Sequence, residues 1–260
     1  MASSLEAAPV PRTRLRERDI EALTFIGRGY EVAQYQLHEA IFASRSPNVV
    51  SRFVSRASKR GFVAAERFGG VGMNRLRLTR RGREFLVDRG IADDELFAPV
   101  KAVALKDVAH TLAINDLRVA LSLSRAPDVL TPAWLLQRRL PTVTAIPDVI
   151  VHWRFRSGRQ GLLMACEVDL GCERLRAVFI PKLDRLERLL RDAVEDDRIA
   201  IAIFTRGMKR LEHLCAYAED SKTQIVPLLL PDTVGSRDGI RAFQAIFDDV
   251  PIVTASVRLG

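Results

Sequence analysis

Residues 47–85 have the sequence PNVVSRFVSRASKRGFVAAERFGGVGMNRLRLTRRGREF, which predicts a helix, a stop and a two-stranded hairpin. Ser46 can cap the helix with its hydroxyl group, and Pro47 suits the first helical position because its missing N–H would be unpaired there anyway. Gly61 supplies the left-handed residue that commonly ends a helix. This order of elements is typical of the recognition helix and wing of a winged helix-turn-helix.

The predicted helix has two chemically different faces. Apolar side chains recur at helical spacing and form one stripe, which predicts the face that packs on a core. The opposite face mixes short hydroxyl and amide groups with cations, a composition that suits a DNA major groove. The alternative is a solvated basic helix beside a surface hairpin. The stripe is Val49, Val50, Phe53, Val54 and Ala57, and the polar face is Asn48, Ser51, Arg52, Ser55, Arg56 and Lys59.

The second strand of the hairpin alternates strictly between apolar and basic residues. Leu76 and Leu78 fall on one side of this strand. Arg75 and Arg77 fall on the other side, so the pattern predicts a half-buried strand with a basic outer face. We expect these two arginines to hold DNA phosphates, while the glycine-rich turn over 69–72 forms the tip of the wing.

The segment before the recognition helix predicts two further helices, over 15–26 and 30–42. Three helices and a wing would complete a DNA-binding domain over residues 14–90. Residues 1–13 are rich in Ala, Ser and Pro, and we expect them to form a disordered tail.

Positive charge is concentrated in the same part of the chain. Residues 1–90 hold 17 Lys and Arg against 9 Asp and Glu, a net charge of +8. The remaining residues hold 23 of each kind, since the whole chain has 40 basic and 32 acidic residues. A polyanion is the simplest partner for such a segment. We expect double-stranded DNA rather than a membrane, because no basic amphipathic helix with a lipid-facing side is apparent.

Composition is that of an ordinary globular protein, with 260 residues, 48% hydrophobic and 28% charged. This length suits two domains, and no apolar run approaches the roughly 20 residues that span a bilayer. The N-terminus lacks the features of a signal peptide. Cys166, Cys172 and Cys215 are odd in number and form no zinc-type pair, so we expect a cytoplasmic location.

Residues 106–260 predict an α/β domain that follows an acidic linker over 91–105. An amphipathic helix over 106–124 is followed by three strands, of which the last two form a hairpin. An apolar run over 199–204 predicts a buried central strand, parallel to a neighbour. The expected strands are 133–138, 148–155, 162–170, 199–204 and 225–230, and the later helices are 182–194, 211–218 and 240–247.

Three carboxylates are expected near one end of this sheet. Asp148 begins one strand of the hairpin, and Glu167 and Asp169 share a face of the other because side chains alternate along a strand. Three converging carboxylates would suit Mg²⁺, which prefers oxygen ligands. The alternative is that they are strand-end acids paired with nearby cations, for which the candidates are Arg138, Arg139 and Arg174.

The second domain resembles the PD-(D/E)xK restriction-endonuclease-like core. Together with the winged helix, the chain resembles the replication-relaxation family of plasmid and mobile-element proteins, over about residues 15–205. The order of several short motifs carries this resemblance. They are the helix segment His110–Asp116, Trp134, Ile146-Pro147-Asp148, the sequence EVDLGCE over 167–173, and Lys182.

The resemblance implies a catalytic lysine two residues after Glu167, and this chain has Asp169 there. Gln137 likewise stands where the family pattern suggests an acid. We therefore expect a nuclease-like domain that is not catalytic and needs no cofactor, because a shared fold does not imply a shared activity. The alternative is a Mg²⁺-dependent DNA endonuclease or nicking enzyme, in which Asp148, Glu167 and Asp169 hold the metal and Lys182 replaces the missing lysine.

The resemblance implies a role in replication control, with transcriptional regulation as a close variant. Double-stranded DNA is the expected partner, and the second domain could contact DNA, form a homodimer or bind a replication or mobilisation protein. The histidines show no ligand spacing, so we expect surface or capping roles for His38, His110, His152 and His213.

Overall fold

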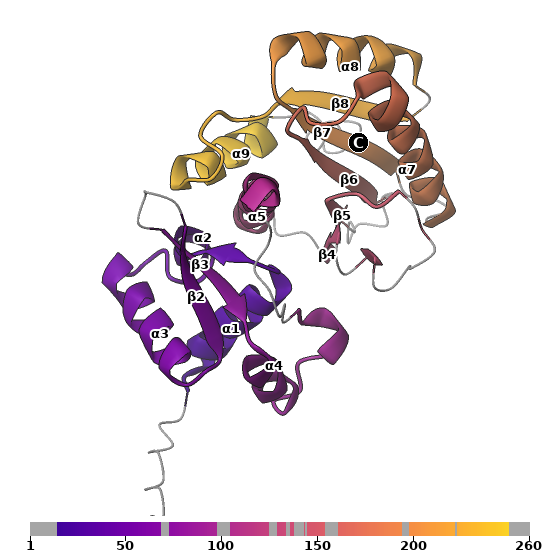
Figure 1. Ribbon diagram of the computed structural model, residues 1–260. Coiled ribbons are helices and arrows are strands. Elements are labelled where there is room, and N and C mark those ends of the chain that lie inside the picture. The colour runs from indigo at the N-terminus through magenta and orange to yellow at the C-terminus, as the bar shows by residue number, and fades with distance from the viewer. Residues whose placement is uncertain are drawn as a thin grey trace, which may run out of the picture.

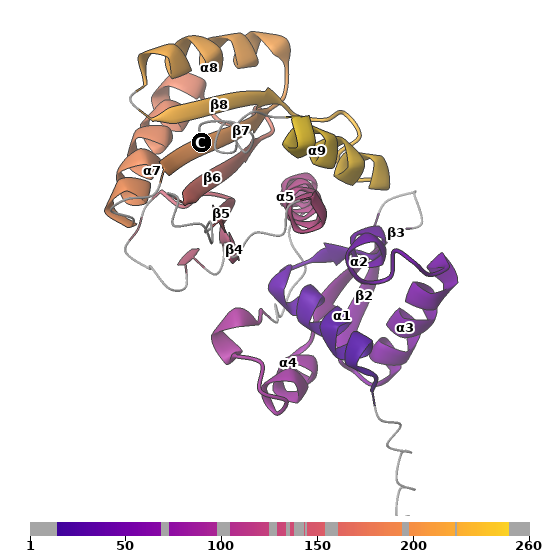
Figure 2. The ribbon, with the colours of Figure 1, turned by 180° about the vertical axis from the view of Figure 1, so that it is seen from behind.

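The computed structural model contains two sheets flanked by helices, so the expected α/β class is confirmed. One sheet has three strands in the order β1-β3-β2, and the other has five in the order β4-β5-β6-β7-β8. Helix α5 lies between the two sheets in both views (Figures 1 and 2). The structure describes residues 15–68, 73–97, 105–124, 129–133, 136–137, 143, 145–153, 161–193, 198–221 and 223–249.

Helices α1 to α4 pack around the three-stranded sheet (Figure 1). The elements are α1 (Glu17–Arg28), β1 (Val32–Ala33), α2 (Gln34–Ile41), α3 (Pro47–Lys59), β2 (Val63–Phe68), β3 (Met73–Leu78) and α4 (Arg80–Val87). The helix expected over 30–42 therefore begins later than predicted. Val32 and Ala33 instead form a short strand, because they pair antiparallel with β3.

Helix α3 begins and ends at the residues that predicted it. Ser46 Oγ accepts a hydrogen bond from the backbone N–H of Asn48 at 3.3 Å, and Pro47 occupies the first turn. Beyond the helix, Gly61 has a φ of 70°, a conformation that residues with a Cβ rarely adopt. The inner face is buried in the core that includes Leu37 and Phe42, as expected for the stripe of Val50, Phe53, Val54 and Ala57.

Strand β3 corrects one expectation about the wing. Leu76 and Leu78 are fully buried, as predicted. The arginines between them are not exposed, however, and the side chains of Arg75 and Arg77 keep only 9% and 11% of their surface accessible. The predicted basic outer face is therefore wrong, because both side chains are largely buried and pair with carboxylates. Arg75 Nη1 lies 3.3 Å from Glu31 Oε2, and Arg77 pairs with Glu66.

The segment after α4, expected to begin a linker, packs onto the first part of the protein. It contains a short 3-10 turn, η2 (Asp93–Glu95). Leu96 is fully buried in the core around the three-stranded sheet. The ring of Phe97 stacks on that of Tyr30 with centroids 4.2 Å apart. The expected tail over 1–13 and residues 98–104 lie outside the described residues.

The second part of the chain contains the remaining elements. They are α5 (Leu105–Ser124), β4 (Val129–Pro132), β5 (Val149–Trp153), β6 (Leu162–Asp169), the π-helix η3 (Leu175–Phe179), α7 (Ile180–Ala193), β7 (Arg198–Thr205), α8 (Met208–Asp220), β8 (Gln224–Leu229) and α9 (Arg237–Asp249). The strand expected over 133–138 is found earlier, as β4, and the described residues 133 and 136–137 are helical. No described helix is long and apolar enough to cross a membrane.

The five-stranded sheet is buried between two layers of helices. Strand β6 pairs antiparallel with β5 and parallel with β7, and β7 is also parallel to β8, so the predicted hairpin pairing and the buried parallel strand are confirmed. Figure 2 shows α5 and α9 on one side of this sheet and α7 and α8 on the other. Cys166 and Val168 face the α5 layer, which places Glu167 and Asp169 on the α7 and α8 side, as the alternation predicted.

A buried polar joint connects α2 to α5. Tyr35 donates a hydrogen bond from its hydroxyl group to Asp116 Oδ1 at 2.6 Å, and Gln36 Nε2 donates to the same oxygen at 2.7 Å. The backbone N–H of Gly235, which precedes α9, donates to Asp116 Oδ2 at 2.7 Å. Asn115 Nδ2 donates to the carbonyl of Glu31 at 2.6 Å. The two sheets are therefore joined by packed, hydrogen-bonded helices.

Candidate nucleic-acid interface and carboxylate pocket

The outer face of α3 is exposed along its length. It is also held at a fixed position beside the hairpin by a chain of hydrogen bonds. Gln34 Nε2 donates to Ser51 Oγ at 2.9 Å, and Asn74 Nδ2 donates to Gln34 Oε1 at 2.9 Å. These bonds link α3 to α2 and to β3. The exposed residues are those expected from the sequence, namely Asn48, Ser51, Arg52, Ser55, Arg56 and Lys59.

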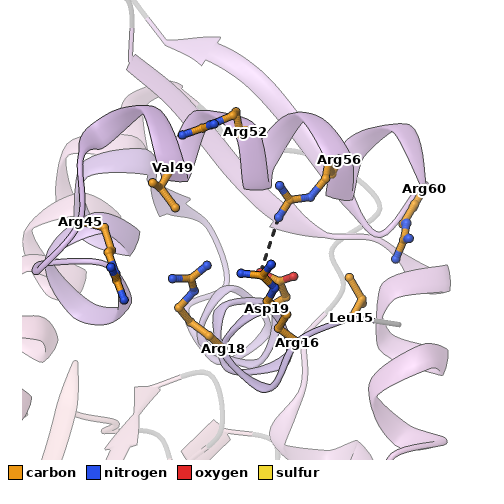
Figure 3. A pocket seen from close by; sticks show the side chains of 9 residues that line it. All are labelled: Leu15, Arg16, Arg18, Asp19, Arg45, Val49, Arg52, Arg56 and Arg60. Atoms are coloured by element: carbon orange, nitrogen blue, oxygen red, sulfur yellow. Dashed lines mark ion pairs between the residues drawn. The ribbon is translucent and has the colours of Figure 1, made fainter. Parts of the chain in front are cut away.

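An arginine-rich groove runs along one flank of this face, between α3 and the start of α1. Figure 3 shows guanidinium groups from both helices and from the turn before α3 around one space, and we call this the arginine groove. Its volume is about 540 Å³. The groove is lined by Leu15, Arg16, Arg18, Asp19, Arg45, Val49, Arg52, Arg56 and Arg60.

Among the described residues that line the groove, six arginines face a single carboxylate. The side chain of Asp19 is only 5% exposed, and its Oδ1 lies 3.7 Å from Arg56 Nη2. That oxygen is buried and accepts no hydrogen bond from the described residues. Arg18 holds its guanidinium 4.8 Å from the centre of the Phe42 ring. The lining is thus strongly cationic, and Asp19 holds one arginine in place.

Only part of this groove was predictable from the sequence. The helical pattern indicated Arg52 and Arg56 on α3, but it did not indicate the four other arginines that the fold brings beside them. The charge excess of residues 1–90 was the available signal. It could not indicate a face, because the groove joins α1 to residues about 30 positions further along the chain. The arginines that were missed are Arg16, Arg18, Arg45 and Arg60.

A second candidate site lies beside the end of β6. The register that pairs Val149 with Cys166 brings Asp148 close to Glu167, as the hairpin predicted. Lys182 reaches the same place from α7, and its Nζ lies 2.6 Å from Glu167 Oε2. The other oxygen, Glu167 Oε1, is buried and accepts no hydrogen bond from the described residues. Glu167 and Lys182 border a cavity of about 250 Å³, which we call the carboxylate pocket.

His110 on α5 also lines this carboxylate pocket, although its expected role was a surface or capping one. Its Nε2 lies 3.3 Å from Asp148 Oδ2 and 2.9 Å from the carbonyl oxygen of Val168. Burial alone would lower the pKa of His110, but the hydrogen bond and the charge of Asp148 outweigh it and raise that pKa above its usual value. His110 belongs to the family-like motif over 110–116, but that motif did not indicate that the histidine lines this pocket.

Glu167 and Lys182 form a buried ion pair in this pocket, and the pKa of each residue is raised. Burial, together with the charge of Asp148, raises the pKa of Glu167 far above the range of an ordinary carboxyl group, although Lys182 partly offsets this effect. Burial tends to lower the pKa of Lys182, but the carboxylates of Glu167 and Asp148 raise it overall. A proton is therefore held more tightly here than on exposed side chains of the same types.

Asp169 does not join the other two carboxylates. Both of its oxygens are engaged by α8 and by backbone, because Arg210 forms a two-pronged ion pair with it and Gly171 N–H donates to Oδ1 at 2.9 Å. Thr205 Oγ1 donates to Oδ2 at 2.9 Å. The described residues contain no group of three His, Cys, Asp or Glu that could hold a metal ion, so the predicted three-carboxylate cluster is wrong. Of the expected partner arginines, Arg138 and Arg139 lie outside the described residues.

Comparison with known proteins identifies a family. A family model described as replication-relaxation matches residues 23–202, which includes the joint between α2 and α5, the exposed face of α3 and the carboxylate pocket, but not Gly235. No curated protein and no solved structure matches the chain. Because the family model covers more than half of the sequence, the chain belongs to the replication-relaxation family.

Proposed function

We propose that this member of the replication-relaxation family binds double-stranded DNA through a winged helix-turn-helix formed by α1 to α3 and the β2–β3 hairpin. Helix α3 enters the major groove, and the hairpin lies beside it as a wing. The protein acts in the cytoplasm on a plasmid or another mobile element, where it controls replication or transcription. The family match supports the link to replication.

The observation that carries this proposal is the division of α3 into a buried and an exposed face. Val50, Phe53 and Val54 anchor the helix in the core, so the helix presents its other side as a rigid surface. Residues on that side can donate and accept hydrogen bonds at base edges, and Arg52 and Arg56 can reach guanine or phosphate. Rigid positioning of such groups is what sequence recognition requires.

Binding to DNA from the gene's own neighbourhood tests this proposal. Fluorescence anisotropy with that duplex and with a mixed-sequence duplex measures affinity and sequence preference. Arg52→Ala should reduce the preference for the cognate duplex by about 1–3 kcal/mol, because a base contact is lost. Arg80→Ala on α4 removes another exposed positive charge and should leave the preference unchanged. Absence of binding by the wild-type protein to either duplex would refute the proposal.

The five-stranded part serves, in this proposal, as a non-catalytic nuclease-like module that contacts DNA, forms a homodimer or binds a replication or mobilisation protein. Two features support this non-catalytic role. Asp169 stands where the family pattern of nucleases has a lysine, and its carboxylate is neutralised by Arg210. The balanced charge of residues 91–260 also favours a module that does not grip DNA strongly by itself.

Cleavage or nicking of DNA with Mg²⁺ is the second candidate function, and one observation favours it. Lys182 contacts Glu167, while Glu167 Oε1 is buried and accepts no hydrogen bond from the part of the chain that the structure describes. Asp148 and Glu167 would hold the ion, which supplies positive charge for the attacking water and the leaving oxygen. Incubation of supercoiled DNA with Mg²⁺ or Mn²⁺ tests it. Cleavage that disappears in Glu167→Gln would establish the activity, and intact DNA in every lane would exclude it.

A further inference from the structure

We propose that the arginine groove binds phosphate groups of the DNA backbone, alongside the segment whose bases face α3. This inference rests on the proposed DNA binding and deepens it. It assigns a phosphate-binding role to Arg16, Arg18, Arg45 and Arg60, and it gives Arg52 and Arg56 a place at the boundary between base contacts and backbone contacts.

The position of the groove suits a strand that passes beside the recognition helix. Arg52 and Arg56 belong both to the exposed face of α3 and to the wall of the groove, so the two surfaces are continuous. Arg45 precedes α3 and Arg60 follows it, so the wall extends over the whole helix, roughly 20 Å at the rise of an α-helix. One DNA strand carries a phosphate for about every 3.4 Å of helix axis, so several phosphates fit this length.

Most of the positive charge in the groove has no carboxylate beside it among the described residues, and Asp19 is the one carboxylate in the lining. Elsewhere, arginines pair with carboxylates, as Arg83 does with Asp93 at 2.6 Å. In the described part of the chain, no ion pair involves Arg16, Arg18, Arg45 or Arg52. Guanidinium groups that face one another repel, and a polyanion would remove this repulsion.

The chemistry of the lining favours phosphate over other anions. Its cations are all arginines, whose planar fork can give two parallel hydrogen bonds to phosphate oxygens. The buried carboxylate of Asp19 on α1 pairs with Arg56 on α3, and Figure 3 shows that this ion pair bridges the two helices. A volume of about 540 Å³ far exceeds that of a few water molecules, so the groove can accept an extended phosphate chain.

The double variant Arg16→Gln/Arg45→Gln tests the role of the groove. Both side chains are exposed, so their loss should leave the fold intact, which circular dichroism can check. The salt dependence of binding to a fluorescein-labelled, mixed-sequence duplex is the measurement. We expect weaker binding to every sequence, and a slope of log K against log salt that is smaller by about one for each arginine removed.

The matched control is Arg80→Gln/Arg241→Gln, which removes the same charge from exposed arginines that already pair with carboxylates. This control should keep the wild-type slope. If the wild-type protein binds no DNA, the proposed function fails and the inference fails with it. If the wild type binds but the groove variant behaves like the control, the groove proposal alone is refuted.

A competition arm distinguishes DNA phosphates from a free polyphosphate. Inorganic triphosphate is added to the wild-type protein and to the groove variant, and the thermal midpoint of each protein is measured. Triphosphate is also added to the complex of the wild-type protein with labelled DNA, and release of the DNA is measured. Stabilisation of the wild type alone, combined with equal DNA binding by both proteins, would assign the groove to a small polyphosphate and overturn the DNA assignment. Loss of DNA binding by the variant, with release of wild-type DNA complexes by triphosphate, supports it.

Discussion

Arg75 illustrates how a single residue can follow a surface pattern and still be buried. Its alternation with Leu76 placed it correctly on the side of β3 away from the core. Its partner, Glu31, is 44 residues upstream and 1% exposed, and no local pattern connects the two.

Lys182 is the opposite case. The family resemblance suggested that this lysine belongs to the site, and the structure places its amine at Glu167. Pairings between distant residues decide burial, and these are absent from local periodicity.

Replacement of Arg75 should therefore affect the stability of the protein rather than its affinity for DNA phosphates. Arg75→Ala leaves the carboxylate of Glu31 buried without this cation, which typically costs about 3–5 kcal/mol of unfolding free energy. Urea denaturation measures this loss. The double variant Arg75→Ala/Glu31→Gln should recover part of it, because the buried charge is gone. A variant as stable as the wild type, but with a smaller salt slope for DNA binding, would restore the original assignment of Arg75 to phosphate contact.

At the level of elements, capping residues were better guides than hydrophobic runs. Ser46 and Gly61 correctly bounded α3, where the Ser46 hydroxyl accepts a hydrogen bond from Asn48 N–H and Gly61 has a positive φ. The short strand β1 was missed because two residues carry no periodicity, and it exists through its pairing with β3. The early position of β4 was missed for a related reason, since its pairing with β5 fixes it rather than its own sequence.

Gly82 determines how closely α4 packs against the hairpin. A Cβ atom at this position would lie 2.3 Å from the carbonyl oxygen of Phe62 and 2.7 Å from Leu78 Cδ1. Alanine improves helix propensity by up to about 1 kcal/mol, but the clash with backbone should dominate. We expect Gly82→Ala to destabilise the protein by about 1–3 kcal/mol in urea denaturation. Glu84→Ala on the exposed side of α4 should change stability by less than about 0.5 kcal/mol, and equal effects of the two would contradict the clash.

For the whole molecule, the contacts that join its parts were the least predictable from sequence. The chain was expected to form two domains with a linker over 91–105, and its local patterns describe each part separately. The joint instead connects residues about 80 positions apart, with Gln36 Nε2 also donating to the carbonyl of Leu112 at 2.9 Å. His110 illustrates the same difficulty, because only the packing of α5 on the five-stranded sheet brings it to Asp148. Such contacts depend on tertiary packing, and the sequence pattern around each residue does not reveal them.

Asp116 should make the stability of this joint depend on pH. Burial raises its pKa from 3.8 to about 6, although hydrogen bonds from Gln36, Tyr35 and Gly235 oppose the shift. Because the folded-state pKa is the higher one, the folded protein binds this proton more tightly than the unfolded chain. The resulting stabilisation is fully present below about pH 4 and is lost as the pH rises through about 6.

Asp116→Asn removes this titration while keeping the shape of the side chain. The difference in unfolding free energy between wild type and variant, measured in urea across this pH range, isolates the contribution of Asp116 from that of other groups. It should favour the wild type most at the acidic end and shift toward the variant as pH rises. A part of the difference that does not depend on pH is also expected, because the asparagine amide turns an N–H₂ group toward one of the three donors at the joint. A difference that is constant with pH would mean that Asp116 titrates in the folded protein as it does in the unfolded chain.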